Sequence, residues 1–140
     1  MAVASVDQAS LLYLIKRLEM AVRKRLTSVL DEYGLTLAQY TALTSLDRQP
    51  DMTAASLARH SFVAAQTTAE LVRALEARGL VLRRTDPSSR RQALLSLTPE
   101  GRRMLDELRP AVAGIEEAIA PAGAAALRRA LDDMRRNLES

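Results

Sequence analysis

The spacing of apolar residues changes once along the chain, and this change limits the folds that the sequence can adopt. In several segments before residue 79 the apolar side chains recur every three or four positions, which is the period of an α-helix. Residues 80–85 and 92–97 are instead strand-like, and Asp86 followed by Pro87 favours a type I turn between them. Helical spacing returns after Thr98. The sequence therefore predicts a mainly α-helical protein with one small two-stranded β-hairpin.

Residues that favour helix ends divide the helical pattern into separate predicted helices. Threonine suits the start of a helix, and Gly34 and Gly79 suit the ends of two helices because glycine readily adopts the left-handed conformation. Pro110 predicts a kink in a long helix near the end of the chain. The predicted helices are residues 8–33, 37–48, 53–60, 64–78, 99–119 and a last helix after Pro121.

The last helix carries an apolar seam with the spacing of a coiled coil. Its members recur at intervals of four, three and four residues, and they are Leu127, Leu131, Met134 and Leu138. This seam predicts either core packing or a dimer interface.

The charges are unevenly distributed, although the net charge is only +3. Between Arg59 and Arg103 there are nine arginines but only four acidic residues. A basic segment within a nearly neutral chain favours a polyanionic partner such as nucleic acid, and a solvated arginine-rich surface is the alternative.

The residue types that are scarce exclude several classes of protein. With no cysteine and a single histidine, the chain lacks the usual means for disulfides, nucleophilic catalysis or a metal site. The sequence also shows no signal peptide and no stretch of roughly 18 consecutive apolar residues. We therefore expect a cytoplasmic protein that is not an enzyme, requires no cofactor and has no membrane partner.

The order of the central elements is typical of a winged helix-turn-helix over residues 53–98. Two helices joined by a short turn are the arrangement that places the second helix in the major groove of DNA. The hairpin that follows would bring Arg90 and Arg91 to the phosphate backbone or the minor groove. Double-stranded DNA is therefore the predicted partner.

Two segments resemble the MarR family of bacterial transcription regulators. They are Leu-Val-Arg-Ala-Leu-Glu-Ala-Arg-Gly-Leu-Val (71–81) and Arg-Arg-Gln-Ala-Leu-Leu-Ser-Leu-Thr-Pro-Glu-Gly (90–101). The resemblance implies a triangular homodimer, in which residues 1–34 and 99–140 form a helical dimerisation region and residues 35–98 form the DNA-binding region of a single intertwined domain. It also implies a repressor that binds a pseudo-palindromic operator and is released by a small aromatic or anionic ligand.

The chain departs from the pattern of this family at two places. Family members often have Thr-Pro at the start of the recognition helix, where this chain has Ala64-Ala65. The wing usually has Asp two residues before its DNA-contacting arginine, and here Ser89 precedes Arg91. These departures favour an alternative function, a protein-interaction module of the same fold with weakened or lost DNA binding.

Candidate DNA contacts lie on the recognition helix, the preceding helix and the wing. Gln66 and Thr67 are expected to face base edges, while Thr68 belongs to the same turn with an inward orientation as its alternative. The candidate phosphate contacts are Arg59, Arg73, Arg90 and Arg91. For Arg59 and Arg73 the alternative is an ion pair with Glu70 or Glu76.

Candidate ligand-binding residues lie where the resemblance implies an effector pocket. Tyr13, Arg17 and Tyr40 on the first two predicted helices would offer phenol and guanidinium groups to an anionic aromatic molecule. Core packing of the tyrosines and a surface ion pair of Arg17 are the alternatives. His60 is a further candidate, with capping or packing at a helix end as its alternative role.

Overall fold

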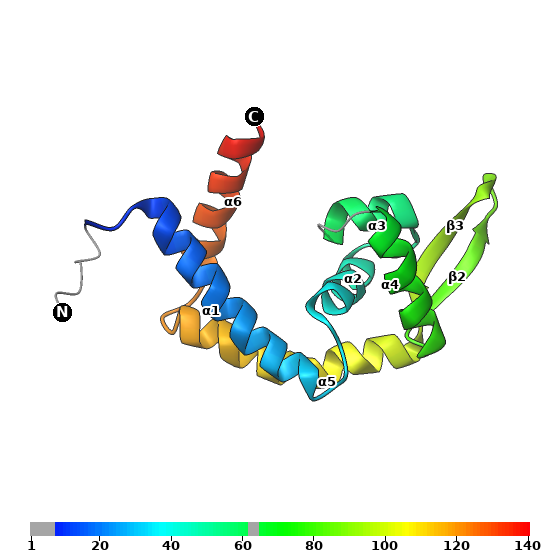
Figure 1. Cartoon of the computed structure of the whole chain (residues 1–140), viewed down its shortest axis with the longest axis horizontal. Coiled ribbons are helices and arrows are strands. Elements are labelled where there is room, and N and C mark those ends of the chain that lie inside the picture. Colours follow the sequence, from blue (N-terminus) through cyan, green and yellow to red (C-terminus); the bar gives the residue numbers. More distant parts are fainter. Residues whose placement is uncertain (1–7, 62–64) are drawn as a thin grey trace.

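The structure, a computed structural model, describes residues 8–61 and 65–140 (Figure 1). Its elements in chain order are α1 (Leu11–Asp31), α2 (Leu37–Arg48), β1 (Met52–Thr53), α3 (Ala54–Ser61), α4 (Ala65–Ala77), β2 (Val81–Asp86), β3 (Ser89–Leu97), α5 (Pro99–Ile119) and α6 (Ala125–Glu139). The mainly helical fold predicted from the sequence is confirmed. Pro110 lies inside α5, which continues as one helix through it.

The helices begin and end where the sequence predicts, within a few residues. Thr36 forms a capping box with Gln39 at the start of α2. Thr53 accepts a hydrogen bond of 3.1 Å from the backbone N–H of Ser56, and so caps α3. Gly79 has a φ of +72°, and the N–H of the following Leu80 reaches back to the carbonyl of Leu75 at 3.0 Å. These local bonds satisfy backbone groups that a helix leaves without partners.

The hairpin is part of a slightly larger sheet than the sequence predicts. Within the described residues the sheet has three antiparallel strands in the order β1-β3-β2, with Met52 opposite Leu95. The prediction of a two-stranded wing was therefore incomplete. A strand of two residues cannot show an alternating pattern, and Asp51, which precedes it, has a φ of +63° that turns the chain into the sheet.

One hydrophobic core joins the helix-turn-helix to the long helices. α1, α2, α3, α4, β3 and α5 each contribute a leucine of 0% exposure, namely Leu30, Leu43, Leu57, Leu75, Leu95 and Leu108. Burial of each such side chain stabilises the fold by about 1.5–3 kcal/mol. Because the end of α1 and the middle of α5 belong to this core, the helix-turn-helix is packed directly on the two long helices.

The remaining parts of the long helices expose large apolar side chains. Figure 1 shows the first half of α1, the end of α5 and α6 on the side of the molecule away from the hairpin. The exposed apolar side chains of these helices are Leu11, Leu12, Tyr13, Ile15, Leu18, Met20, Ile119, Leu127, Leu131, Met134 and Leu138. No helix in residues 8–61 and 65–140 is long and apolar enough to cross a bilayer.

The start of α5 is packed tightly against the turn that follows α4. Thr98 Oγ1 donates a hydrogen bond of 2.5 Å to the carbonyl of Gly79, and the Thr98 N–H donates to the carbonyl of Leu80 at 3.1 Å. A Cβ atom on Gly101 would lie 2.2 Å from the same Leu80 oxygen. Only glycine allows the backbone of α5 to approach the turn this closely.

We therefore expect Gly101→Ala to destabilise the protein by about 1–3 kcal/mol, the usual cost of overpacking. Thermal unfolding followed by circular dichroism measures the change. Gly114→Ala is the matched control, because it lies on the same helix and its added Cβ would meet nothing within 4 Å. An unfolding temperature of Gly101→Ala equal to that of the unmodified protein would contradict this account of the contact.

Candidate nucleic-acid interface

Helix α4 has one face in the core and one face in solvent. Leu71, Val72 and Leu75 are buried against the other helices, whereas Thr67 and Arg73 are exposed. The exposed face begins in the first turn of α4, at the end that meets α3 (Figure 1). This is the arrangement in which the first turn of a recognition helix can reach base edges.

Thr68 does not belong to the exposed face. Its side chain is 1% exposed, so it packs inside the protein and cannot contact DNA. Thr68 follows Thr67 by one position, and a rotation of about 100° per residue moves it from the solvent side to the core side. The prediction of Thr68 as a DNA contact is therefore corrected. Gln66 lies in the first turn of α4, but its side chain, like residue 64, is outside the described part of the structure.

The nine arginines between Arg59 and Arg103 divide into two groups. Five are engaged by the fold. Arg78 donates to backbone carbonyls, and the other four form ion pairs, which are Arg83 with Glu76, Arg84 with Asp51, Arg102 with Asp47 and Arg103 with Glu100.

The other group consists of Arg59, Arg73, Arg90 and Arg91, which we call the free arginines. All four side chains are exposed, and none has a hydrogen bond or an ion pair with any residue that the structure describes. Glu76, the alternative partner of Arg59 and Arg73, instead accepts two hydrogen bonds from Arg83 at 3.1 and 2.9 Å. The free arginines are the four that the sequence predicts as phosphate contacts.

Two of the free arginines occupy an irregular part of the wing. Thr85 lies opposite Ala93 and Asp86 lies opposite Ser89, so residues 90–92 of β3 have no direct partner on β2. Such a bulge bends a strand and changes the direction of its side chains. Arg90 and Arg91 are therefore in a segment that departs from the regular ladder.

The carboxylate of the wing, Asp86, is bound by the neighbouring Ser88. Asp86 Oδ1 accepts hydrogen bonds from the backbone N–H of Ser88 at 2.9 Å and from its hydroxyl at 2.7 Å. The backbone bond is the larger cause, with the hydroxyl bond second, of a pKa of Asp86 below its usual value. The wing thus offers two exposed guanidinium groups with no carboxylate bound to either.

The predicted ligand-binding residues are not brought together in one site. Arg17 lies over the ring of Tyr13, with the guanidinium carbon 5.7 Å from the ring centroid, on the exposed first half of α1. His60 lies on α3, where its Nδ1 is 2.7 Å from the carbonyl oxygen of Ser56. Tyr40 alone of these four lines a cleft between α2 and α5. The spacing of residues along each helix could not predict this separation, because the distance between residues on different helices depends on how those helices cross.

The cleft has a volume of about 260 Å³ and combines apolar and charged walls. Its lining from α2 is Tyr40, Thr44 and Asp47, and its lining from α5 is Leu105, Arg109, Val112, Ala113 and Glu116. Burial raises the pKa of the Tyr40 phenol, and the Glu116 carboxylate raises it further. The phenol can therefore serve as a hydrogen-bond donor at neutral pH. Among the described residues, no group of three or more His, Cys, Asp or Glu is arranged to hold a metal ion.

The α5 wall of the cleft was missed by the sequence analysis. Arg109, Val112, Ala113 and Glu116 are spaced by three, one and three residues, and so share one face of a helix. The sequence shows that these residues share a face, but it does not show that this face meets α2.

A comparison with protein families matches residues 35–93 to the model of the MarR family. The HTH-type transcriptional repressor Rv2887 of Mycobacterium tuberculosis (strain ATCC 25618 / H37Rv) is 36% identical over 96 residues, which are 69% of this chain and 69% of the repressor. The chain belongs to the MarR family. The resemblance predicted from residues 71–81 and 90–101 is therefore confirmed.

Solved structures of MarR-family and related regulators have the same fold. The transcriptional repressor CouR, in a structure bound to a 23-mer DNA duplex, is 27% identical with a TM-score of 0.81, and the match covers 100% of this chain and 99% of CouR. Rv2887 of Mycobacterium tuberculosis in complex with p-aminosalicylic acid is 29% identical with a TM-score of 0.69, covering 94% of this chain and all of that one. This MarR-family protein is a DNA-binding transcription regulator, and not an enzyme.

We expect Arg91→Ala to weaken binding to all DNA sequences and to reduce its dependence on salt. Each lost phosphate contact lowers the slope of log K against log salt by about one unit per winged domain on the DNA. Fluorescence anisotropy of a labelled duplex at several KCl concentrations measures both effects. Arg103→Ala removes the same charge from α5, where Arg103 already pairs with Glu100, and should leave the slope unchanged. An unchanged slope for Arg91→Ala would show that Arg91 makes no phosphate contact.

Proposed function

We propose that this protein is a homodimeric repressor that binds a pseudo-palindromic operator and is released by a small aromatic ligand. In each subunit α4 enters the major groove with Gln66 and Thr67 toward the bases. Arg59 and Arg73 contact phosphates beside it, and Arg90 and Arg91 of the wing contact the adjacent backbone or minor groove. Residues 35–98 form the DNA-binding region, and residues 1–34 and 99–140 join the subunits.

The observation that carries this proposal is the set of free arginines. An exposed arginine that has no partner within the described chain keeps its full charge available for an external anion. Neutralising phosphates with such groups releases counterions from DNA, which is the main source of affinity for DNA of any sequence. The four free arginines lie on α3, α4 and the wing, which are the elements that a winged helix-turn-helix presents to a duplex.

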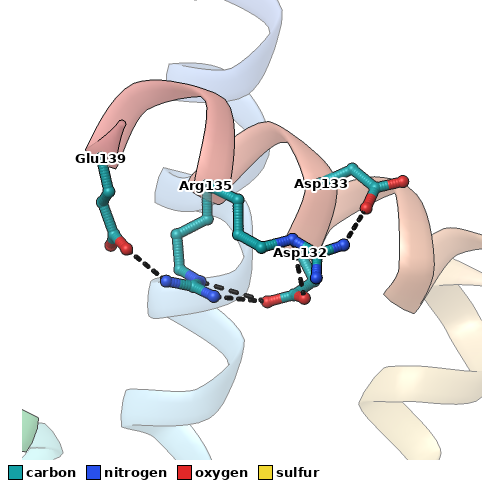
Figure 2. Close-up of polar contacts among 5 residues, drawn as sticks. Asp132, Asp133, Arg135 and Glu139 are labelled. Atoms are coloured by element: carbon teal, nitrogen blue, oxygen red, sulfur yellow. Dashed lines mark hydrogen bonds and ion pairs between the residues drawn. The ribbon is translucent and has the colours of Figure 1, made fainter.

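The exposed apolar side chains support a dimer formed by the long helices. Soluble monomers rarely expose large contiguous apolar surfaces, and such surfaces usually mark an interface. Charged residues in the second half of α6 pair with each other, as Figure 2 shows for Arg135 between Asp132 and Glu139. Arg135 lies 2.9 Å from Asp132, and the pairing also lowers the pKa of that carboxyl. The leucine seam of the same helix, which is Leu127, Leu131, Met134 and Leu138, remains 38–87% exposed in the described chain, and a second copy offers an apolar surface of the same kind.

The cleft between α2 and α5 supports the ligand part of the proposal. It lies between α2 of the proposed DNA-binding region and α5 of the proposed dimerisation region, so a bound molecule can alter how the two regions are placed. Rv2887 has been solved in complex with p-aminosalicylic acid and with salicylic acid, and these are the first aromatic compounds to try. A ligand that binds the free form better than the DNA-bound form must lower DNA affinity, because the two equilibria are linked.

Selection of bound duplexes from random DNA tests the proposed function directly. We expect enrichment of a two-fold-related sequence with half-sites about 10 bp apart, bound in a salt-dependent manner. The selected duplex is then titrated with salicylate in the presence of the protein, and a fall in affinity is expected. Tyr40→Phe should weaken this response while leaving affinity without ligand unchanged. Failure to enrich any duplex would instead favour a protein-interaction module that has lost DNA binding.

We expect Leu131→Asp to convert the dimer into a monomer. Leu131 is 52% exposed in the single chain, and a charge at the centre of the leucine seam would lose its hydration if a second copy covered it. Sedimentation equilibrium gives the molecular mass of the particle. Leu82→Asp is the matched control, since Leu82 is 55% exposed on β2, and it should remain dimeric. A dimer that persists in Leu131→Asp would place the interface elsewhere.

A further inference from the structure

The turn that ends the recognition helix is attached to both long helices. We propose that Arg78 is a positioning residue, which fixes the orientation of α4 relative to the helices that join the subunits. This inference rests on the proposed dimeric DNA-binding function, and it assigns to Arg78 a role in aligning two recognition helices rather than in contacting DNA.

Arg78 forms a two-pronged contact with the end of α1. It is the first residue after α4, and its Nη1 donates to the carbonyl of Gly34 at 2.8 Å while its Nη2 donates to the carbonyl of Tyr33 at 2.9 Å. A planar guanidinium can hold two acceptors at once in a fixed geometry, which a lysine ammonium cannot. Both carbonyls lie in the turn that leads from α1 to α2. The contact therefore joins the end of α4 to the turn that follows α1, within the proposed dimerisation region of residues 1–34.

The other side of the same turn is bound to α5. The carbonyls of Gly79 and Leu80 accept hydrogen bonds from Thr98, and Gly101 packs directly against Leu80. These contacts come from backbone and from the helix cap of α5, whereas among the described residues both hydrogen bonds from the turn to the end of α1 are donated by Arg78. One side chain thus controls one of the two polar attachments of α4.

Arg78 is at the wrong end of α4 to contact the DNA that Thr67 faces. The two residues are separated by eleven positions, which corresponds to about 16 Å along a helix. The guanidinium of Arg78 is also occupied by its two carbonyl partners. Its removal should therefore leave phosphate contacts intact and change only how firmly α4 is held.

A loosely held α4 should affect binding to a duplex with two half-sites more than binding to a duplex with one. A single winged domain can adjust to one half-site whatever its position relative to α1. A dimer on two half-sites about 10 bp apart needs both recognition helices in register at the same time. Loss of Arg78 should therefore weaken binding to the two-half-site duplex selectively.

The test compares Arg78→Ala, Arg78→Lys, Arg91→Ala and Arg103→Ala on two duplexes of equal length. One duplex carries both half-sites of the selected sequence, and the other has one half-site scrambled. For Arg78→Ala we expect about a tenfold loss on the full duplex, the effect of about one charge-assisted hydrogen bond, and little loss on the half duplex. The salt slope should match that of the unmodified protein. On the full duplex, the affinity of Arg78→Lys should lie between those of Arg78→Ala and the unmodified protein. If Arg78→Ala does not fold, Arg78→Lys is the variant that tests the proposal.

The controls separate positioning from contact. Arg91→Ala should lose affinity for both duplexes with a reduced salt slope, and Arg103→Ala should bind both normally. The positioning role of Arg78 would be overturned by any of three results for Arg78→Ala. These are an equal loss of affinity for both duplexes, a reduced salt slope, and an unchanged affinity for the full duplex. If the unmodified protein shows no salt-dependent binding to either duplex, the proposed DNA-binding function itself fails, and this result is visible before any variant is measured.

Discussion

The three-residue turn at Arg78, Gly79 and Leu80 is the constraint on which the arrangement of the molecule depends. It ends α4 and starts the wing. It donates hydrogen bonds to the turn that follows α1, and it accepts a hydrogen bond and close packing from the start of α5. Gly79 allows the turn through its positive φ, and Gly101 allows α5 to approach it. A recognition helix fixed at this end presents its other end, with Thr67, to solvent in a defined direction. The shared core around Leu75 and Leu108 reinforces the same attachment.

The arginines between Arg59 and Arg103 fall into those that bind other parts of the fold and those that remain exposed without a partner in the described chain. Arg78, Arg83 and Arg84 hold the end of α4 and the sides of the wing to neighbouring elements, through two carbonyls, Glu76 and Asp51. Exposed ion pairs of this kind add little to stability, typically up to about 1 kcal/mol. Their larger effect is electrostatic. The carboxylates offset the charges of Arg83 and Arg84, and the arginines of residues 59–103 that stay unpaired in the described chain lie on α3, α4 and the wing.

Local features of the fold could be predicted from the sequence because local forces decide them. The helix caps at Thr36, Thr53 and Thr98 depend on residues within three positions, and the structure confirms them. Strand β1 was missed because two residues carry no pattern. Thr68 was assigned to the wrong face because the phase of α4 is set by the core that it packs against. The role of the free arginines as phosphate contacts stays a prediction, and their lack of partners in the described chain depends on distances between elements far apart in the sequence.

The candidate ligand-binding residues illustrate what the sequence alone could not predict. Tyr13, Arg17, Tyr40 and His60 were chosen for their chemistry, and only Tyr40 lies in the cleft between α2 and α5. Its walls are formed by two helices whose crossing no single-helix pattern specifies. The order of the elements predicted the fold and the DNA partner, and the resemblance to the MarR family added to both, whereas the placement of individual side chains required the structure.

Hydroxyl-radical footprinting of the selected duplex tests most directly whether two aligned winged domains contact DNA through the free arginines. The account predicts two clusters of protected sugars on one face of the duplex, about 10 bp apart, with flanking protection from each wing. The flanking protection alone should be lost in a variant that replaces both Arg90 and Arg91 with alanine. A single protected cluster, or flanking protection that survives this replacement, would contradict the account.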